Sequence, residues 1–179
     1  MFVVESSAVL PHPPDVVYAA IASIESLLRW QAGVRAVRRP PAMPPAARSR
    51  GPVVLTYRAL GVGHALTARV LAAESPHLFA YRAEGAAFAL EARYRVEPAP
   101  GGAHVVCRVA LDTTASRQTA DCVALRRLLA RRVVSDLTRL DRWVAARGCP
   151  ERPGAAPLAP RRPHRRAPHH SPSTSPIQP

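Results

Sequence analysis

Residues 88–113 read FALEARYRVEPAPGGAHVVCRVALDT, and this stretch decides the fold class. Over residues 88–97, apolar or small side chains alternate with charged or small ones. Alternation with period two is typical of an antiparallel strand that has one buried and one solvated face. The prolines and glycines of residues 98–102 predict a turn, and the alternation resumes over residues 105–111. The stretch therefore predicts a β-hairpin with an apolar inner face.

Shorter stretches nearer the start of the chain repeat this pattern. Residues 55–59 and 64–70 alternate on either side of Gly61-Val62-Gly63, which predicts a second hairpin. Residues 79–81 supply the inner face of a short strand, and residues 4–10 supply that of the first strand. One antiparallel sheet is therefore expected.

Two short helices are expected between the first strand and the others. Proline is tolerated in a first helical turn and an acidic residue is favoured there, so Pro14 and Asp15 predict a helix that continues over residues 16–22. Ser23 fits the N-cap of a second helix, with Glu25 in its first turn and its end near Trp30.

A long amphipathic helix is predicted from about Thr119 to Gly148, where glycine suits the C′ position. Its apolar residues recur at spacings of three and four, as the face of a helix requires. They are Cys122, Leu125, Leu129, Val133, Leu137, Leu140 and Val144. The order of strand, two short helices, about six strands and one long helix predicts an α+β protein.

Two proline-rich segments interrupt these patterns. Residues 40–52 predict a long exposed loop between strands, because proline breaks both helices and sheet ladders. Residues 148–179 have few large apolar side chains and cannot offset the entropy of ordering, so we expect a disordered tail. The folded domain is then residues 1–147.

The amino-acid composition limits which classes of function are expected for this protein. The formal net charge is +13, yet every basic residue is arginine, which we interpret as codon bias on ordinary solvated surfaces. Binding to nucleic acid is therefore not expected, although a basic surface attracts anions. Three cysteines without a CxxC pair indicate neither a disulfide framework nor a zinc site, and they suit the cytoplasm. No apolar run is long enough for a transmembrane segment.

Four parts of the chain resemble one known group of proteins. Residues 8–18 (AVLPHPPDVVY) and 23–30 (SIESLLRW) resemble its opening strand and helices. Residues 94–98 (YRVEP) with Gly101-Gly102 resemble its central hairpin, and residues 137–141 (LTRLD) its last helix. The group is the SRPBCC superfamily, also called START-like or helix-grip, in its polyketide cyclase/dehydrase-like or coenzyme-Q-binding branch. Ser23 stands where the family usually has aspartate, and Gln31-Ala32-Gly33 follows the tryptophan in place of a proline-containing segment.

This resemblance implies the helix-grip fold, in which a bent antiparallel sheet of six or seven strands wraps around the C-terminal helix. It also implies an apolar cavity between sheet and helix that binds lipids, polyketides or quinones. The inward positions of the strands and the helix face supply the expected ligand-binding residues: Trp30, Leu55, Tyr57, His64, Leu66, Val70, Phe79, Tyr81, Phe88, Leu90, Tyr94, Val109, Leu125, Leu129 and Val133.

Few of these inward residues carry chemistry. No clear strand presents an inward carboxylate, so a pair of carboxylates for acid–base catalysis is not expected. His64 is the one candidate for proton transfer, because histidine titrates near neutral pH, but a position at the end of a strand also fits it. Tyr57, Tyr81 and Tyr94 can direct hydroxyl groups at a ligand carbonyl or simply pack.

Three functions are compatible with the sequence. The first is binding of a hydrophobic small molecule of the lipid, polyketide or quinone class, without metal or cofactor. The second is a cofactor-free cyclase or dehydratase that uses His64 and a cavity tyrosine. The third is an RNA- or ribosome-associated interaction protein that uses the arginine-rich surface. The sequence leaves the oligomeric state open.

Overall fold

The computed structural model describes residues 1–40, 51–59, 61–113 and 119–148. The predicted tail falls almost entirely on residues 149–179, and most of the predicted proline-rich loop falls on residues 41–50, so both predictions lie outside the described residues. The elements are, in chain order, β1 (Phe2–Leu10), α1 (Pro14–Ile21), α2 (Leu27–Trp30), β2 (Val34–Arg38), β3 (Val53–Ala59), β4 (Val62–Glu74), β5 (Leu78–Glu84), β6 (Phe88–Ala99), β7 (Gly102–Thr113) and α3 (Thr119–Gly148).

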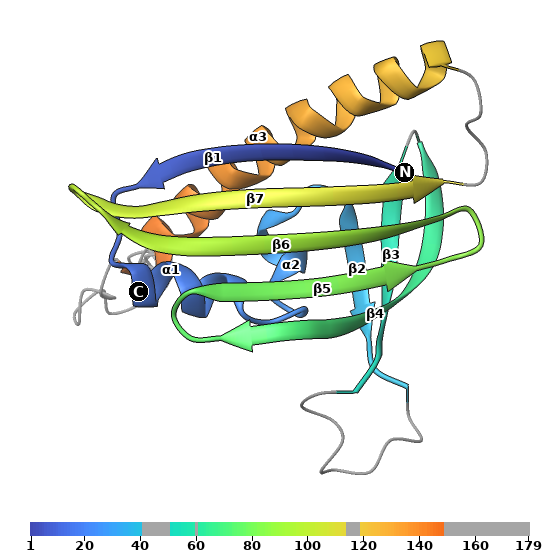
Figure 1. The fold of residues 1–179 in the computed structure, drawn as a ribbon. Coiled ribbons are helices and arrows are strands. Elements are labelled where there is room, and N and C mark those ends of the chain that lie inside the picture. Colours follow the sequence, from blue (N-terminus) through green and yellow to red (C-terminus); the bar gives the residue numbers. More distant parts are fainter. Residues whose placement is uncertain (41–50, 60, 114–118, 149–179) are drawn as a thin grey trace, which may run out of the picture. The chain divides into compact units, whose positions relative to one another are not determined.

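The strands form a seven-stranded antiparallel sheet in the order β1-β7-β6-β5-β4-β3-β2 (Figure 1). The predicted hairpins are confirmed, because β6 pairs with β7 and β3 pairs with β4. Gly61 begins the β3–β4 turn with φ of +84°, a conformation that favours glycine. Since β1 and β2 are the two edges, the α1–α2 segment carries the chain from one edge of the sheet to the other. The α+β helix-grip architecture is therefore confirmed.

The sheet is bent, and two irregularities lie in the part that turns most. The pairing register shifts between Val70 and Ala72 in β4, and again between Val34 and Ala36 in β2. An extra residue in one strand bends it and increases the local twist. In Figure 1, β2 and β3 accordingly run across the direction of β6 and β7. The bulge also breaks the alternation in β2, which explains why the sequence pattern did not reveal this strand.

Helix α2 begins later than the sequence predicted. Ser23 was expected to cap it, but residues 23–26 form turns in which Ser26 Oγ donates to the Ser23 carbonyl at 2.6 Å and Ser23 Oγ donates to Glu25 Oε2 at 2.8 Å. Because these side chains stabilise a turn, the helix is confined to Leu27–Trp30. The short helix ends by placing Trp30, which is 1% exposed, in the core.

Helix α3 packs tightly over only part of its length. Val133, Leu137, Leu140 and Val144 are buried, whereas Leu128 is 48% exposed. Helix α3 contacts β1, α1 and α2, and in Figure 1 its first turns rise away from β1 and β7. The first half of the helix is therefore less closely covered than the second half.

The outer face of the sheet carries charges that pair with one another. Arg93 Nε lies 2.7 Å from Glu91 Oε1, Arg82 pairs with Glu84, and Arg95 lies 3.9 Å from Glu97. The alternation that buries one face thus exposes matched charges on the other. Within the described residues, no helix has both the length and the apolar character to cross a membrane.

Leu140→Ala is expected to destabilise the domain much more than Leu128→Ala. Leu140 is fully buried in the tightly packed half of α3, so truncation leaves a cavity and should cost about 2–5 kcal/mol. Leu128 is 48% exposed, and its truncation should cost less than about 1 kcal/mol. Urea unfolding of both variants measures the difference. Equal losses would show that α3 packs uniformly along its length.

Candidate functional site

A cavity of about 500 Å³ lies between the concave face of the sheet and α3. It is lined by residues of α2, of strands β3 to β7 and of α3, and most of the exposed lining is apolar. The lining consists of Trp30, Gln31, Tyr57, Arg58, Ala59, Val62, His64, Tyr81, Ala87, Phe88, Leu90, Ala92, Tyr94, Cys107, Val109, Leu111, Thr113, Leu125, Leu128, Leu129, Arg132, Val133, Asp136 and Leu137. This is the volume of a small-molecule site.

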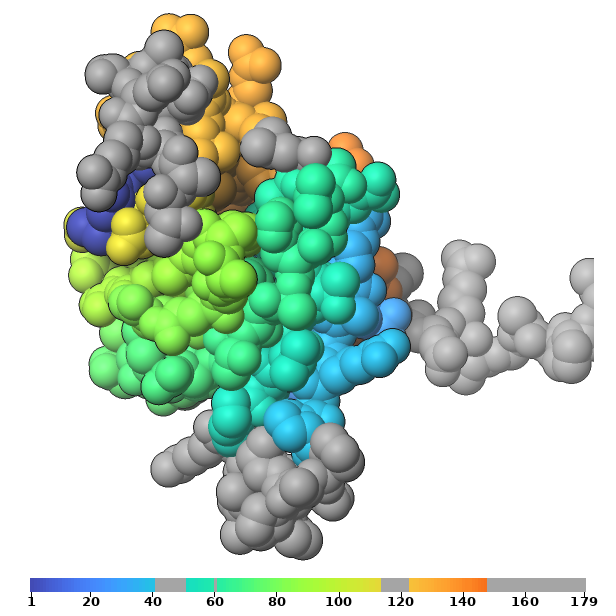
Figure 2. Space-filling view, turned by 90° about the vertical axis from the view of Figure 1, so that its right-hand side faces the viewer, coloured from blue at the N-terminus to red at the C-terminus, as the bar shows by residue number. Residues whose placement is uncertain are grey.

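The cavity opens where the sheet and the first half of α3 diverge. Figure 2 looks at that end, with the gold turns of α3 above the green β3–β4 and β5–β6 hairpins. Two lining residues there, Val62 and Leu128, are 58% and 48% exposed. Because large apolar side chains border the opening, a hydrophobic molecule meets apolar surface from its first contact.

Near this mouth, His64 and two aromatic rings line one side of the cavity. The His64 ring lies edge-to-face with Phe88, with 5.2 Å between ring centroids, and Tyr57 is likewise 6.1 Å from Phe88. Tyr57 and His64 are directly paired across β3 and β4, so their side chains project from the same face of the sheet. The site thus combines one titratable ring with one phenol.

The inner end is polar, and its first group of residues surrounds Gln31. Gln31 is buried, and its Nε2 donates to Tyr94 Oη at 2.6 Å. Tyr81 Oη donates to Gln31 Oε1 at 3.2 Å. Trp30 packs edge-to-face on the Tyr94 ring at 5.6 Å. The amide therefore holds two tyrosines from neighbouring strands in fixed positions.

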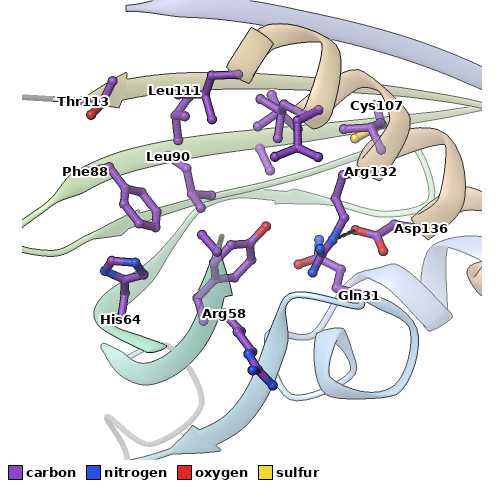
Figure 3. Close-up of a pocket in the computed structure, with 18 of the residues that line it drawn as sticks. Gln31, Arg58, His64, Phe88, Leu90, Cys107, Leu111, Thr113, Arg132 and Asp136 are labelled. Carbon is purple, nitrogen blue, oxygen red and sulfur yellow. Dashed lines mark ion pairs between the residues drawn. The ribbon is translucent and has the colours of Figure 1, made fainter. Parts of the chain in front are cut away.

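A charged pair from α3 completes the inner end. Asp136 Oδ1 accepts a hydrogen bond of 2.9 Å from the backbone N–H of Ala32, and Asp136 Oδ2 lies 4.0 Å from Arg132 Nε. The Arg132 guanidinium also stands over the Tyr57 ring, 6.0 Å from its centroid. Gly33 makes room for these groups, since a Cβ atom there would lie 2.3 Å from the Tyr57 ring and 2.8 Å from Arg132 Nη2. Figure 3 shows Gln31, Arg132 and Asp136 together, away from His64 and Phe88.

Burial changes the titration of the inner groups. It raises the pKa of Tyr81 and Tyr94 above the usual value, and the neighbouring Cys107 raises that of Tyr94 further. Burial also raises the pKa of Tyr57, although Arg132 opposes this, and it raises the pKa of Asp136 against the opposing Ala32 N–H and Arg132. The phenols are therefore neutral donors at physiological pH and not bases.

Most of the residues expected to bind a ligand lie in the cavity wall, and four do not. Leu55, Leu66 and Phe79 point inward but are 1% exposed and pack in the core, and Val70 packs against the core beside them. These four belong to the part of the sheet that other side chains cover. The eleven that line the cavity are Trp30, Tyr57, His64, Tyr81, Phe88, Leu90, Tyr94, Val109, Leu125, Leu129 and Val133.

Sequence reasoning missed the polar inner end. The sequence analysis considered carboxylates only on the strands, whereas Asp136 enters the wall from α3. A signal existed, because Asp136 falls between Val133 and Leu140 on the predicted buried face of the helix. Gln31 was noted only as the residue after the tryptophan. In the described part of the chain, no three His, Cys, Asp or Glu side chains are grouped as metal ligands.

Comparison of sequences identifies one family. The family described as polyketide cyclase / dehydrase and lipid transport matches residues 1–145. A search of curated protein sequences found no match.

Several solved structures share the fold at low sequence identity. A START superfamily protein from Mycobacterium smegmatis is 11% identical with a TM-score of 0.67, over 80% of this chain and 97% of that one. The protein TTHA0849 from Thermus thermophilus is 20% identical with a TM-score of 0.66, over 82% and 99%. The Zhui aromatase/cyclase from Streptomyces sp. R1128 is 17% identical with a TM-score of 0.65, over 82% and 94%. At these identities the likeness establishes the fold alone.

Cys107 is expected to react very slowly with iodoacetamide in the native protein. Burial raises the pKa of its thiol to about 12 from 9.0, so at pH 7 the reactive thiolate is on the order of 10³ scarcer than in an ordinary thiol. The rate should increase about tenfold per pH unit up to that pKa. Mass spectrometry measures this rate of Cys107 alkylation in a protein that carries Cys122→Ser and Cys149→Ser. Equal rates for native and guanidinium-unfolded protein would contradict the buried position.

Proposed function

The chain belongs to the polyketide cyclase / dehydrase and lipid transport family, and on that premise we propose that it binds a hydrophobic small molecule in the cavity between the sheet and α3. The observation that carries the proposal is the cavity of about 500 Å³ with its largely apolar wall. A site of this kind holds a ligand mainly through burial of apolar area, at ~25 cal/mol per Å².

The distribution of polar groups supports an elongated ligand with one polar end. In Figure 3, Leu90 and Leu111 lie on the side of Phe88, whereas Gln31 and Asp136 stand at the inner end. A molecule with an apolar body thus buries most of its surface and keeps one polar contact. A lipid with a polar head and a quinone with an apolar side chain have this form, whereas a polyketide carries oxygen atoms along its length.

Val109→Phe is expected to weaken the binding of the neutral fluorophore N-phenyl-1-naphthylamine by about tenfold. Val109 lines the cavity, and a larger ring there occupies space the ligand needs. Losing about 50 Å² of ligand contact corresponds to ~1.3 kcal/mol, close to a tenfold change in Kd. Fluorescence titration measures the change.

Val106→Phe is the matched control for this experiment. Val106 is on the same strand but an odd number of residues from Val109, so its side chain projects from the other face of the sheet. The Val106→Phe variant should bind the fluorophore with the same Kd as the parent protein. If both variants bind alike, or if the parent takes up no fluorophore, quinone or fatty acid, the cavity is not the binding site.

Catalysis of the cyclase or dehydratase type is the second candidate function. It is favoured by one observation, the placement of His64 and Tyr57 opposite each other on β4 and β3 in the cavity wall. In an enolisation, a ring nitrogen of His64 takes the proton from a carbon next to a carbonyl. The C–H electron pair moves toward the carbonyl oxygen, and the neutral Tyr57 hydroxyl donates a hydrogen bond to that oxygen.

His64→Phe separates catalysis from binding. If the site enolises its ligand, the parent protein accelerates deuterium exchange at the α-carbon of a bound aryl 1,3-diketone, and the variant loses ~10²-fold or more of that rate. NMR follows the exchange, and fluorophore displacement shows that the diketone is still bound. Exchange at the buffer rate with the parent protein would exclude this role and leave the binding function standing.

An RNA-associated role receives little support from the outer face of β5 and β6. The arginines of β5 and β6 are paired with glutamates, as Arg82 with Glu84 and Arg93 with Glu91, so this face offers phosphates little uncompensated charge. The role stays a prediction that salt-dependent retention on RNA would test. The cytoplasmic location likewise stays a prediction.

A further inference from the structure

The outer side of helix α3 exposes apolar and cationic side chains together. Val123, Arg127, Arg131 and Val134 follow one another at spacings of four, four and three, so they lie along one side of the helix. All four are exposed, Val123 by 49% and Val134 by 55%. In Figure 1 the first turns of α3 rise away from β1 and β7, which leaves this side open. We call these four residues the outer stripe of α3.

The two arginines of the outer stripe lack a counter-charge. In the part of the chain that the structure describes, neither Arg127 nor Arg131 forms an ion pair, whereas Arg82 and Arg93 of the sheet are paired with glutamates. Along the helix, no acidic residue lies three or four positions from either arginine. They lie four positions from each other, where like charges on a helix repel. An anion bound to both arginines therefore relieves a repulsion.

The carboxylates in the second half of α3 are committed to other partners. Asp136 is buried, and its Oδ1 accepts a hydrogen bond from the backbone N–H of Ala32. Asp141 Oδ1 lies 3.1 Å from His12 Nε2, in the turn between β1 and α1. Because both carboxylates are held by groups outside the helix, they leave the positive charge of the outer stripe uncompensated.

The apolar members of the outer stripe distinguish between anionic partners. The phosphates of a nucleic acid attract arginines, but they offer no apolar surroundings for exposed valines. The boundary of a bilayer that contains anionic lipids accepts both kinds of side chain, since phosphates lie above the acyl chains. Leu128, which is 48% exposed next to Arg127 in the chain, adds to the apolar area. The combination favours a lipid surface.

We propose that the outer stripe docks α3 on the surface of a membrane that contains anionic lipids. Arg127 and Arg131 then contact lipid phosphates, while Val123 and Val134 enter the boundary between headgroups and acyl chains. The attachment is peripheral and reversible, because the apolar area is small. This inference goes beyond the proposed function, and it does not require a ligand in the cavity.

Sedimentation of the full chain with vesicles tests the docking. The parent protein should bind vesicles of phosphatidylglycerol and phosphatidylcholine in equal parts, and it should bind vesicles of phosphatidylcholine alone weakly. Arg127→Gln/Arg131→Gln should weaken binding to the anionic vesicles ~25-fold, since each arginine near such a surface contributes about a fivefold change in affinity. Absence of binding by the parent protein would overturn the proposal.

Arg82→Gln/Arg93→Gln is the matched control, because it removes the same net charge from the outer face of the sheet. Both arginines of this control are paired with glutamates and lie outside the outer stripe. Residues 149–179 are common to all variants, so their arginines cannot produce a difference. The control should keep most of the parent's affinity. Equal losses in the two double variants would show that net charge, and not the outer stripe, governs binding.

Val123→Ser/Val134→Ser separates a lipid surface from RNA. The two substitutions keep the arginines and remove apolar area, so they should weaken binding to the anionic vesicles and leave retention on polyuridylate unchanged. Unchanged vesicle binding by this variant, or tighter binding of the parent protein to polyuridylate than to the vesicles, overturns the lipid surface. Uptake of N-phenyl-1-naphthylamine is measured on the same proteins and decides the cavity function separately.

Discussion

Helix α3 meets the sheet closely along only one half of its length, and the rest of the site depends on this constraint. Val133 and Leu140 are buried and hold the second half in place, whereas Leu125 and Leu129 are half-buried and cover the sheet without filling the space beneath. Close packing along the whole helix would leave no cavity. The register shifts in β2 and β4 add to the bend, so that the strands surround this space, and the short helix with Trp30 closes its inner end.

The polar groups at the inner end of the cavity are held in fixed orientations by hydrogen bonds. Gln31 fixes the two phenols and Ala32 fixes Asp136, so these groups are oriented before a ligand arrives. Burial keeps the phenols protonated, which suits them to donating hydrogen bonds and not to removing protons. The inner end therefore offers oriented polar groups and no phenolate base. Since one fold can serve many functions, any chemistry must come from side chains such as His64 near the mouth.

By itself, the sequence determined the elements whose patterns are local. Alternation with period two revealed the β6–β7 hairpin and which side of it faces inward, and the spacing of three and four revealed α3 from Thr119 to Gly148. The start of α2 escaped this reasoning because side chains of residues 23–26 stabilise turns in place of a helical turn. Strand β2 escaped because a bulge interrupts its alternation.

Only the tertiary structure decided which inward residues line the cavity and what stands at its inner end. Leu55 and Leu90 both point inward, yet Leu90 lines the cavity, whereas Leu55 does not because other side chains of the core cover it. The polar end joins residues far apart in the chain: Gln31 and Tyr94 are separated by 63 positions, and Ala32 and Asp136 by 104. Periodicity in the sequence shows which face of its own helix or strand a residue lies on. Contacts between residues so far apart in the chain depend on how the helices and strands pack against one another.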